Sequence, residues 1–119
     1  GVNYYIQLKH RNSIETWSNT TPAFVSNDMT YNFTSAITQA FGSNMPQIDI
    51  SPVKFGIYCG DINQDGTIDA GDLSQVENDA SVSLTGYVQA DLNGDDFVDG
   101  SDVSIVENNA SLGINVISP

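Results

Sequence analysis

Basic residues are scarce in this chain, and they are confined to its first half. The 119 residues include only three Lys and Arg against fifteen Asp and Glu, which gives a net charge of −12. Twelve of the acids lie between Asp61 and Glu107, a stretch that contains no Lys or Arg. Because a surface that binds nucleic acid needs a basic patch, we expect no nucleic-acid partner.

Cysteine and long apolar runs are also nearly missing. Cys59 is the single cysteine, so no intrachain disulfide framework exists. We expect it to be a buried small side chain, with an intermolecular disulfide as the alternative. No apolar run approaches membrane-spanning length, so we expect no membrane insertion. The chain begins at Gly1 rather than Met and shows no signal peptide, and we therefore expect a fragment or processed product of a longer chain.

Oxygen-bearing side chains recur at fixed intervals in the stretch from Asp61 to Asp72. They occupy positions 1, 3, 5, 9 and 12 of a loop and are Asp61, Asn63, Asp65, Asp69 and Asp72. Gly66 stands at position 6, where a calcium loop turns sharply. This spacing is typical of the EF-hand loop, in which Ca²⁺ collects six to eight oxygens at about 2.3–2.6 Å. The main-chain carbonyl of Thr67 would supply position 7, and Asp69 is expected to act through water.

The same pattern returns thirty residues later in the chain. The second set of expected ligands is Asp91, Asn93, Asp95, Phe97 (through its carbonyl), Asp99 and Asp102. The match continues into the residues after each loop, which indicates an internal duplication and predicts two Ca²⁺ sites. Each loop should lead into a short amphipathic helix, over Leu73–Ala80 and Val103–Ala110. Ile68 and Val98 stand at position 8, where paired EF-hands form a short bridge between their loops.

The second loop departs from the first at position 6, where Asp96 replaces glycine. This position needs a left-handed backbone, which costs a residue with a side chain roughly 1 kcal/mol. We predict that the second site binds Ca²⁺ more weakly than the first.

The first half of the chain shows the alternation of short strands. Residues 2–9 and 14–17 predict a hairpin around a turn at 10–13, and residues 36–42 predict one or two turns of helix. Further strands are expected at 24–25, 29–33, 48–50 and 53–57, which makes about five or six in all. A sandwich usually has about seven strands. We therefore predict an α+β protein, with a small β-rich, partial sandwich-like half followed by the two calcium loop–helix repeats.

The duplicated loops carry a family resemblance. Residues 60–110 resemble a type I dockerin, with two D-x-N-x-D loops that are each followed by a helix. Tyr4-Tyr5-Ile6 and the run from Lys9 to Ser18 resemble a segment that precedes dockerin-like C-termini in large secreted bacterial proteins. The resemblance implies two domains, a β-rich segment at 1–58 and a dockerin-like module at 59–119, in an extracellular protein that docks onto a cohesin. In dockerins, loop positions 10 and 11 contact the cohesin. The residues there are Ala70, Gly71, Gly100 and Ser101, which are not the family's hydroxyl pairs.

Three functions fit these observations. The first is a secreted, calcium-binding structural module that assembles with other chains, in one form as the repeating unit of an extracellular filament. The alternatives are an adaptor for a cohesin-like receptor and a non-catalytic C-terminal fragment of a larger secreted enzyme or adhesin. We expect no enzyme, because most of the acids are accounted for as calcium ligands and the sequence implies no cleft for the rest. We expect His10 to be a solvated turn residue rather than a catalytic base.

Overall fold

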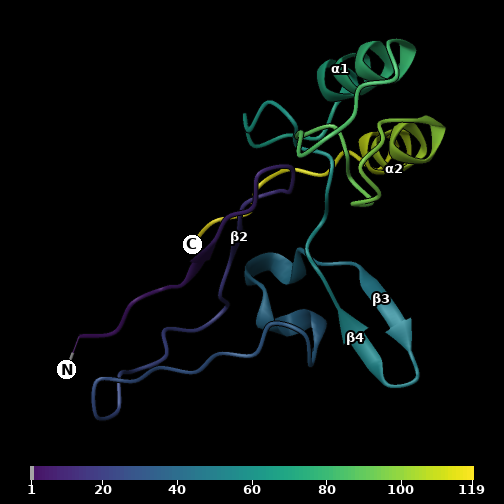
Figure 1. Ribbon diagram of the computed structural model, residues 1–119. Helices are drawn as coiled ribbons and strands as arrows, with labels where there is room; N and C mark the ends of the chain where they lie inside the picture. Colours follow the sequence, from purple (N-terminus) through teal and green to yellow (C-terminus); the bar gives the residue numbers. More distant parts are fainter. Residues whose placement is uncertain (1) are drawn as a thin grey trace. The chain divides into compact units, whose positions relative to one another are not determined.

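The computed structural model describes residues 2–119, and the expectation attached to Gly1 lies outside them (Figure 1). Contacts divide the chain into two compact units. Unit 1 contains the described residues up to Lys9 together with 15–57 and 117–119. Unit 2 contains His10–Ile14 and Tyr58–Val116. Within the described residues, no helix has the length and apolar character needed to cross a membrane.

Unit 1 contains two small antiparallel sheets. Strand β1 (Gln7–Leu8) pairs with β2 (Thr16–Trp17), and β3 (Gln47–Ile50) pairs with β4 (Val53–Phe55). The predicted hairpin therefore exists, but each of its strands is only two residues long, next to the turn. The strands at 48–50 and 53–57 are also found, and the second of them ends two residues early.

Other expectations for unit 1 are wrong in detail. The described residues form no strand at 29–33, and at 24–25 they form only an isolated bridge between Val25 and Asp28. Tyr31 and Phe33 pack edge-on against each other, with ring centroids 4.8 Å apart, and need no neighbouring strand to cover them. The predicted helix at 36–42 is two 3-10 turns, η1 (Ile37–Gln39) and η2 (Phe41–Ser43).

Unit 2 contains two helices of equal length, α1 (Ala70–Ser81) and α2 (Gly100–Ser111). Both begin three residues before the predicted start, because Asp69 and Asp99 cap them. Together with the sheets of unit 1, these helices make the protein α+β, as predicted. The core of unit 2 consists of fully buried apolar side chains from both repeats and from one residue far upstream: Ile14, Ile62, Ile68, Val76, Ala90, Val98 and Val106.

The two calcium loops are braced crosswise. The Ile68 N–H donates to the Ile114 carbonyl (2.9 Å), and the Val98 N–H donates to the Leu84 carbonyl (2.9 Å). Each position-8 residue therefore pairs with the segment that follows the other repeat's helix. The expected direct bridge between Ile68 and Val98 is wrong, because their main chains take these partners while both side chains enter the core.

Candidate metal centre

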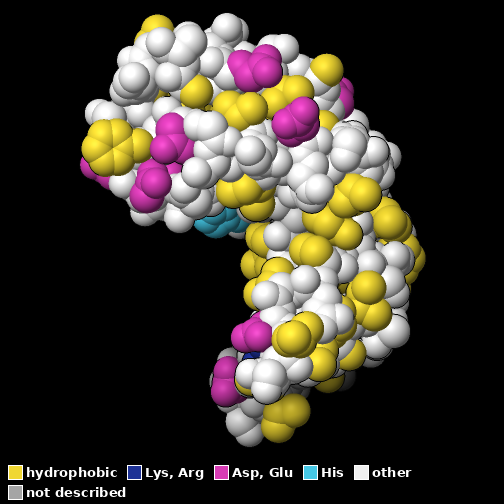
Figure 2. Space-filling model, turned by 90° about the vertical axis from the view of Figure 1, so that its right-hand side faces the viewer, with side chains coloured by type: hydrophobic (Ala, Val, Ile, Leu, Met, Phe, Trp, Pro, Cys, Tyr) yellow, Lys and Arg dark blue, Asp and Glu magenta, His cyan; other side chains and the backbone are white. Residues whose placement is uncertain are grey.

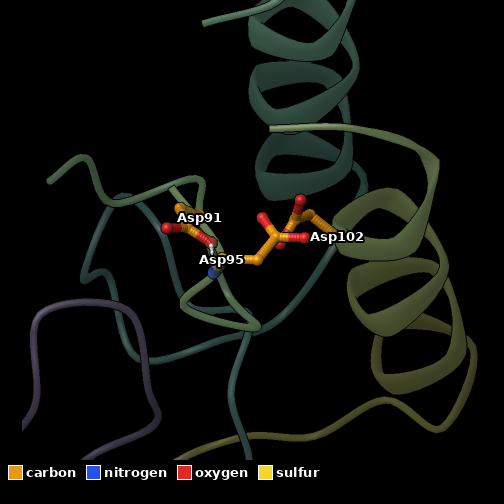
Figure 3. Close-up of side chains that lie close together, drawn as sticks. All are labelled: Asp91, Asp95 and Asp102. Atoms are coloured by element: carbon orange, nitrogen blue, oxygen red, sulfur yellow. Dashed lines mark hydrogen bonds between the residues drawn. The ribbon is translucent and has the colours of Figure 1, made fainter. Parts of the chain in front are cut away.

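Three carboxylates of the second loop converge. Oxygen atoms of Asp91, Asp95 and Asp102 all lie within 4.8 Å of one another. Figure 3 shows Asp102 reaching from the start of α2 toward the two loop carboxylates. Oxygens at this separation can share one cation whose Ca²⁺–oxygen distances are about 2.3–2.6 Å.

Backbone donors hold the carboxylate of Asp91, at position 1 of this loop. It accepts hydrogen bonds from the N–H groups of Gly94 (2.8 Å), Asp95 (3.2 Å) and Asp96 (3.0 Å). The left-handed backbone of Asp96, with φ +74°, turns its N–H toward Asp91. The loop is therefore folded around the carboxylate that a metal would need.

The carboxylate of Asp102, at position 12, is also held by main-chain donors. It is fully buried, and it accepts hydrogen bonds from the N–H groups of Leu92 (2.7 Å), Asn93 (3.2 Å) and Asp99 (2.9 Å). A buried carboxylate with three donors is held in one orientation. It is positioned in advance for a ligand role.

The first loop repeats this hydrogen-bond pattern. Asp61 accepts from the N–H groups of Asp65 (3.2 Å) and Gly66 (3.1 Å), and buried Asp72 accepts from Ile62 (2.8 Å), Asn63 (3.2 Å) and Asp69 (2.9 Å). Within residues 2–119, however, the acids of the first loop do not form a group as tight as the triad of the second.

The remaining expected ligands line the loops in matching pairs. The side-chain oxygens of Asn63 and Asn93 each accept from the N–H two residues later, at 3.0 Å. The N–H groups of Thr67 and Phe97 donate to Asp65 and Asp95, also at 3.0 Å. The two loops therefore make the same hydrogen bonds between main-chain N–H groups and side-chain oxygens at positions 3, 5 and 7.

Asp69 and Asp99 have a second role that the sequence reasoning missed. Each is the N-cap of its helix and accepts from the N–H two residues later at 2.8 Å. Their partners Asp72 and Asp102 complete a capping box. The signal was present as D-x-x-D at loop positions 9 to 12, although the usual third residue after the cap is Glu or Gln.

Electrostatics favour a cation in these loops. Burial raises the pKa of Asp61, the nearby carboxylates of Asp72 and Asp65 raise it further, and the N–H of Gly66 opposes the change. Figure 2 shows acidic side chains at several places on the surface of the repeats. The ligand set of carboxylates, asparagine amides and main-chain carbonyls suits a hard cation such as Ca²⁺.

Two residues outside the loops were singled out in the sequence, and Cys59 is less buried than predicted. Cys59 is half-buried, and burial raises the pKa of its thiol. His10 is exposed, and its Nδ1 lies 3.0 Å from the side-chain oxygen of Asn12.

These features define a class of protein: a calcium loop–helix module of the EF-hand type, built from two repeats. Residues 59–111 match the family model of the dockerin type I domain, so this part of the chain is a dockerin type I-like module. The matched span is slightly less than half of the chain, and a β-containing segment precedes it. Comparison with curated proteins and with solved structures gives no match.

The family match explains the site. Dockerin domains are non-catalytic modules that bind calcium and dock onto cohesin-like proteins, and they occur in secreted or cell-surface bacterial proteins. The second loop's acidic cluster is consistent with that calcium chemistry.

Proposed function

We propose that this chain is a secreted, calcium-stabilised structural module that assembles with other protein chains. The convergence of Asp91, Asp95 and Asp102 is the observation that carries the calcium part. We assign one ion to each loop. The first is held by Asp61, Asn63, Asp65, Thr67, Asp69 and Asp72, and the second by Asp91, Asn93, Asp95, Phe97, Asp99 and Asp102. Residues 59–119, together with His10–Ile14, would form the calcium module, and the rest of residues 1–58 would supply contacts to other chains.

The assembly part of the proposal is supported by the surface of unit 1. Within the described residues, β3 and β4 form a two-stranded sheet. The Phe55 N–H of β4 donates to the Thr34 carbonyl (3.0 Å), whereas no further strand pairs with β3, which leaves β3 as an open edge. The apolar side chains of Ile48, Ile50 and Val53 are 66, 80 and 49 % exposed. Figure 2 shows apolar side chains spread over this part of the surface. An open edge with exposed apolar residues favours strand addition between copies, as in a filament.

An adaptor for a cohesin-like receptor is the second candidate. The positions that contact cohesin in dockerins are all exposed here, including Ala70, Gly71, Gly100 and Ser101 and the helix residues Glu77, Asn78, Glu107 and Asn108. The surface that a receptor would need is therefore accessible.

Light scattering and electron microscopy of the purified chain test both candidates. We expect polymers in calcium that dissociate in excess chelator. The double variant Ile50→Ser/Val53→Ser, which alters a cross-strand pair of the exposed sheet, should bind calcium normally but assemble poorly. Val82→Ser/Leu112→Ser, which changes two comparably exposed residues of the calcium module, is the matched control. A calcium-loaded monomer that captures a cohesin would favour the adaptor instead.

A further inference from the structure

Five residues from the N-terminal half belong to the calcium module. His10–Ile14 lies outside the residues that match the dockerin family, yet it is part of unit 2. Ile14 is fully buried in the core between the two repeats. The module is therefore completed by a segment more than forty residues upstream of it.

Main-chain hydrogen bonds fix this segment against the chain that leads into the first loop. The Ile14 N–H donates to the Tyr58 carbonyl (2.8 Å), and the Gly60 N–H donates to the Asn12 carbonyl (2.6 Å). Ser13 and Cys59 form an antiparallel bridge between these contacts. The segment is thus in strand-like pairing and does not merely cover an apolar surface.

The side chain of Asn12 reaches the second loop. It is only 3 % exposed, and its Nδ2 donates to the carbonyls of Gln89 (3.2 Å) and Asp91 (3.3 Å). Its Oδ1 lies 3.0 Å from His10 Nδ1 and accepts from Ser13 Oγ (3.4 Å). Because both ends of the amide have partners, the amide holds the main chain at the residue whose carboxylate occupies loop position 1.

Further contacts attach the segment to both loops. Arg11 donates to the Val88 carbonyl, and its guanidinium lies 4.0 Å from the ring centroid of Tyr87. In the first loop, Gln64 Nε2 donates to the carbonyls of Ser13 (3.2 Å) and Asp61 (2.6 Å). The segment is therefore joined to the position-1 residue of each loop, directly at Asp91 and through Gln64 at Asp61.

We propose that residues 10–14 are part of the calcium centre and that Asn12 positions Asp91, a ligand of its second site. Asn12 does not bind the metal. It holds the carbonyl of Asp91, and so fixes the direction in which the carboxylate points. This inference rests on the proposed calcium binding. Residues that orient metal ligands typically change affinity by 10- to 100-fold when they are removed.

Calcium titration by calorimetry of the full chain tests the proposal. Asn12→Ala should weaken the second site by about tenfold or more and leave the first within about twofold. The sites are assigned with Asp65→Ala and Asp95→Ala, each of which removes one of them. Asn19→Ala, at an exposed asparagine of the same half, should leave both affinities unchanged. Unchanged affinities in Asn12→Ala, or equal weakening of both sites, would overturn the positioning role.

A measurement on the unaltered chain covers the case in which Asn12→Ala does not fold. The side-chain amide signals of Asn12 in a ¹H–¹⁵N spectrum should shift along the binding curve of the second site. Signals that stay fixed through the titration would refute the inference. A wild-type chain that binds no calcium would instead refute the proposed function itself, so the two failures are distinct.

Discussion

At the scale of single residues, the two loops differ most at position 6. Gly66 has φ +90° and Asp96 has φ +74°, so both backbones are left-handed as the loop pattern predicted. Glycine adopts this conformation without steric cost, whereas a residue with a Cβ does not. The hydrogen bonds of Asp96 to Asp91 and Gly86 use only its main chain. The side chain of Asp96 is therefore dispensable for the loop's geometry.

We predict that Asp96→Gly stabilises the calcium-loaded protein by up to about 1 kcal/mol, because it removes the left-handed strain. Urea unfolding in saturating calcium measures the change. Asp96→Asn is the matched control, since it removes the same charge and keeps the strained backbone. If the glycine variant is no more stable than the asparagine variant, strain at this position does not limit the second loop.

At the scale of elements, the repeats could be predicted from sequence, whereas the first residues of their helices could not. The spacing of acids located both loops and both helices. It predicts helix starts three residues late, because the loop pattern uses Asp69 and Asp99 only as metal ligands. In the structure they also cap α1 and α2. One carboxylate can both cap a helix and bind a metal, and the sequence pattern alone does not distinguish these two roles.

The crosswise bracing predicts that each loop depends on the other repeat. Asp95→Ala should remove the second ion, loosen α2 and its following segment, and so raise amide exchange at Ile68, whose N–H donates to Ile114. Asp65→Ala should raise exchange at Val98 in the same way, through Leu84. Hydrogen exchange followed by NMR gives the residue resolution needed. Exchange that rises only within the mutated loop would contradict this coupling.

At the scale of the whole molecule, the sequence predicted the class of fold but not the membership of its units. Alternation of apolar residues implied strands at 29–33, where aromatic packing satisfies the same residues without a sheet. The sequence also does not predict that residues 10–14 pack in the second unit. Their partners lie between Tyr58 and Asp91, and periodicity reports only on local neighbours. The sequence predicts that Ile14 is a strand residue of the first half of the chain, whereas the structure buries it in the core of unit 2.

The uneven charge leads to a prediction for the whole chain. The net charge is −12, and all twelve acids after residue 60 lack a basic partner in that region. Mutual repulsion among these acids should destabilise the calcium-free protein. Salt should weaken that repulsion, because the screening length falls from about 30 Å at 0.01 M to about 10 Å at 0.1 M. A gain of about 1 kcal/mol would raise the Tm by roughly 4–8 °C for a domain of about this size.

Thermal unfolding at these two salt concentrations measures the effect. In saturating calcium the rise should be smaller, because two bound ions would offset four of the charges and their binding adds its own stability. Magnesium at equal concentration should stabilise less than calcium, since it demands a tighter octahedral shell than these loops offer. A salt response of equal size with and without calcium would mean that repulsion among the loop acids is not what calcium relieves.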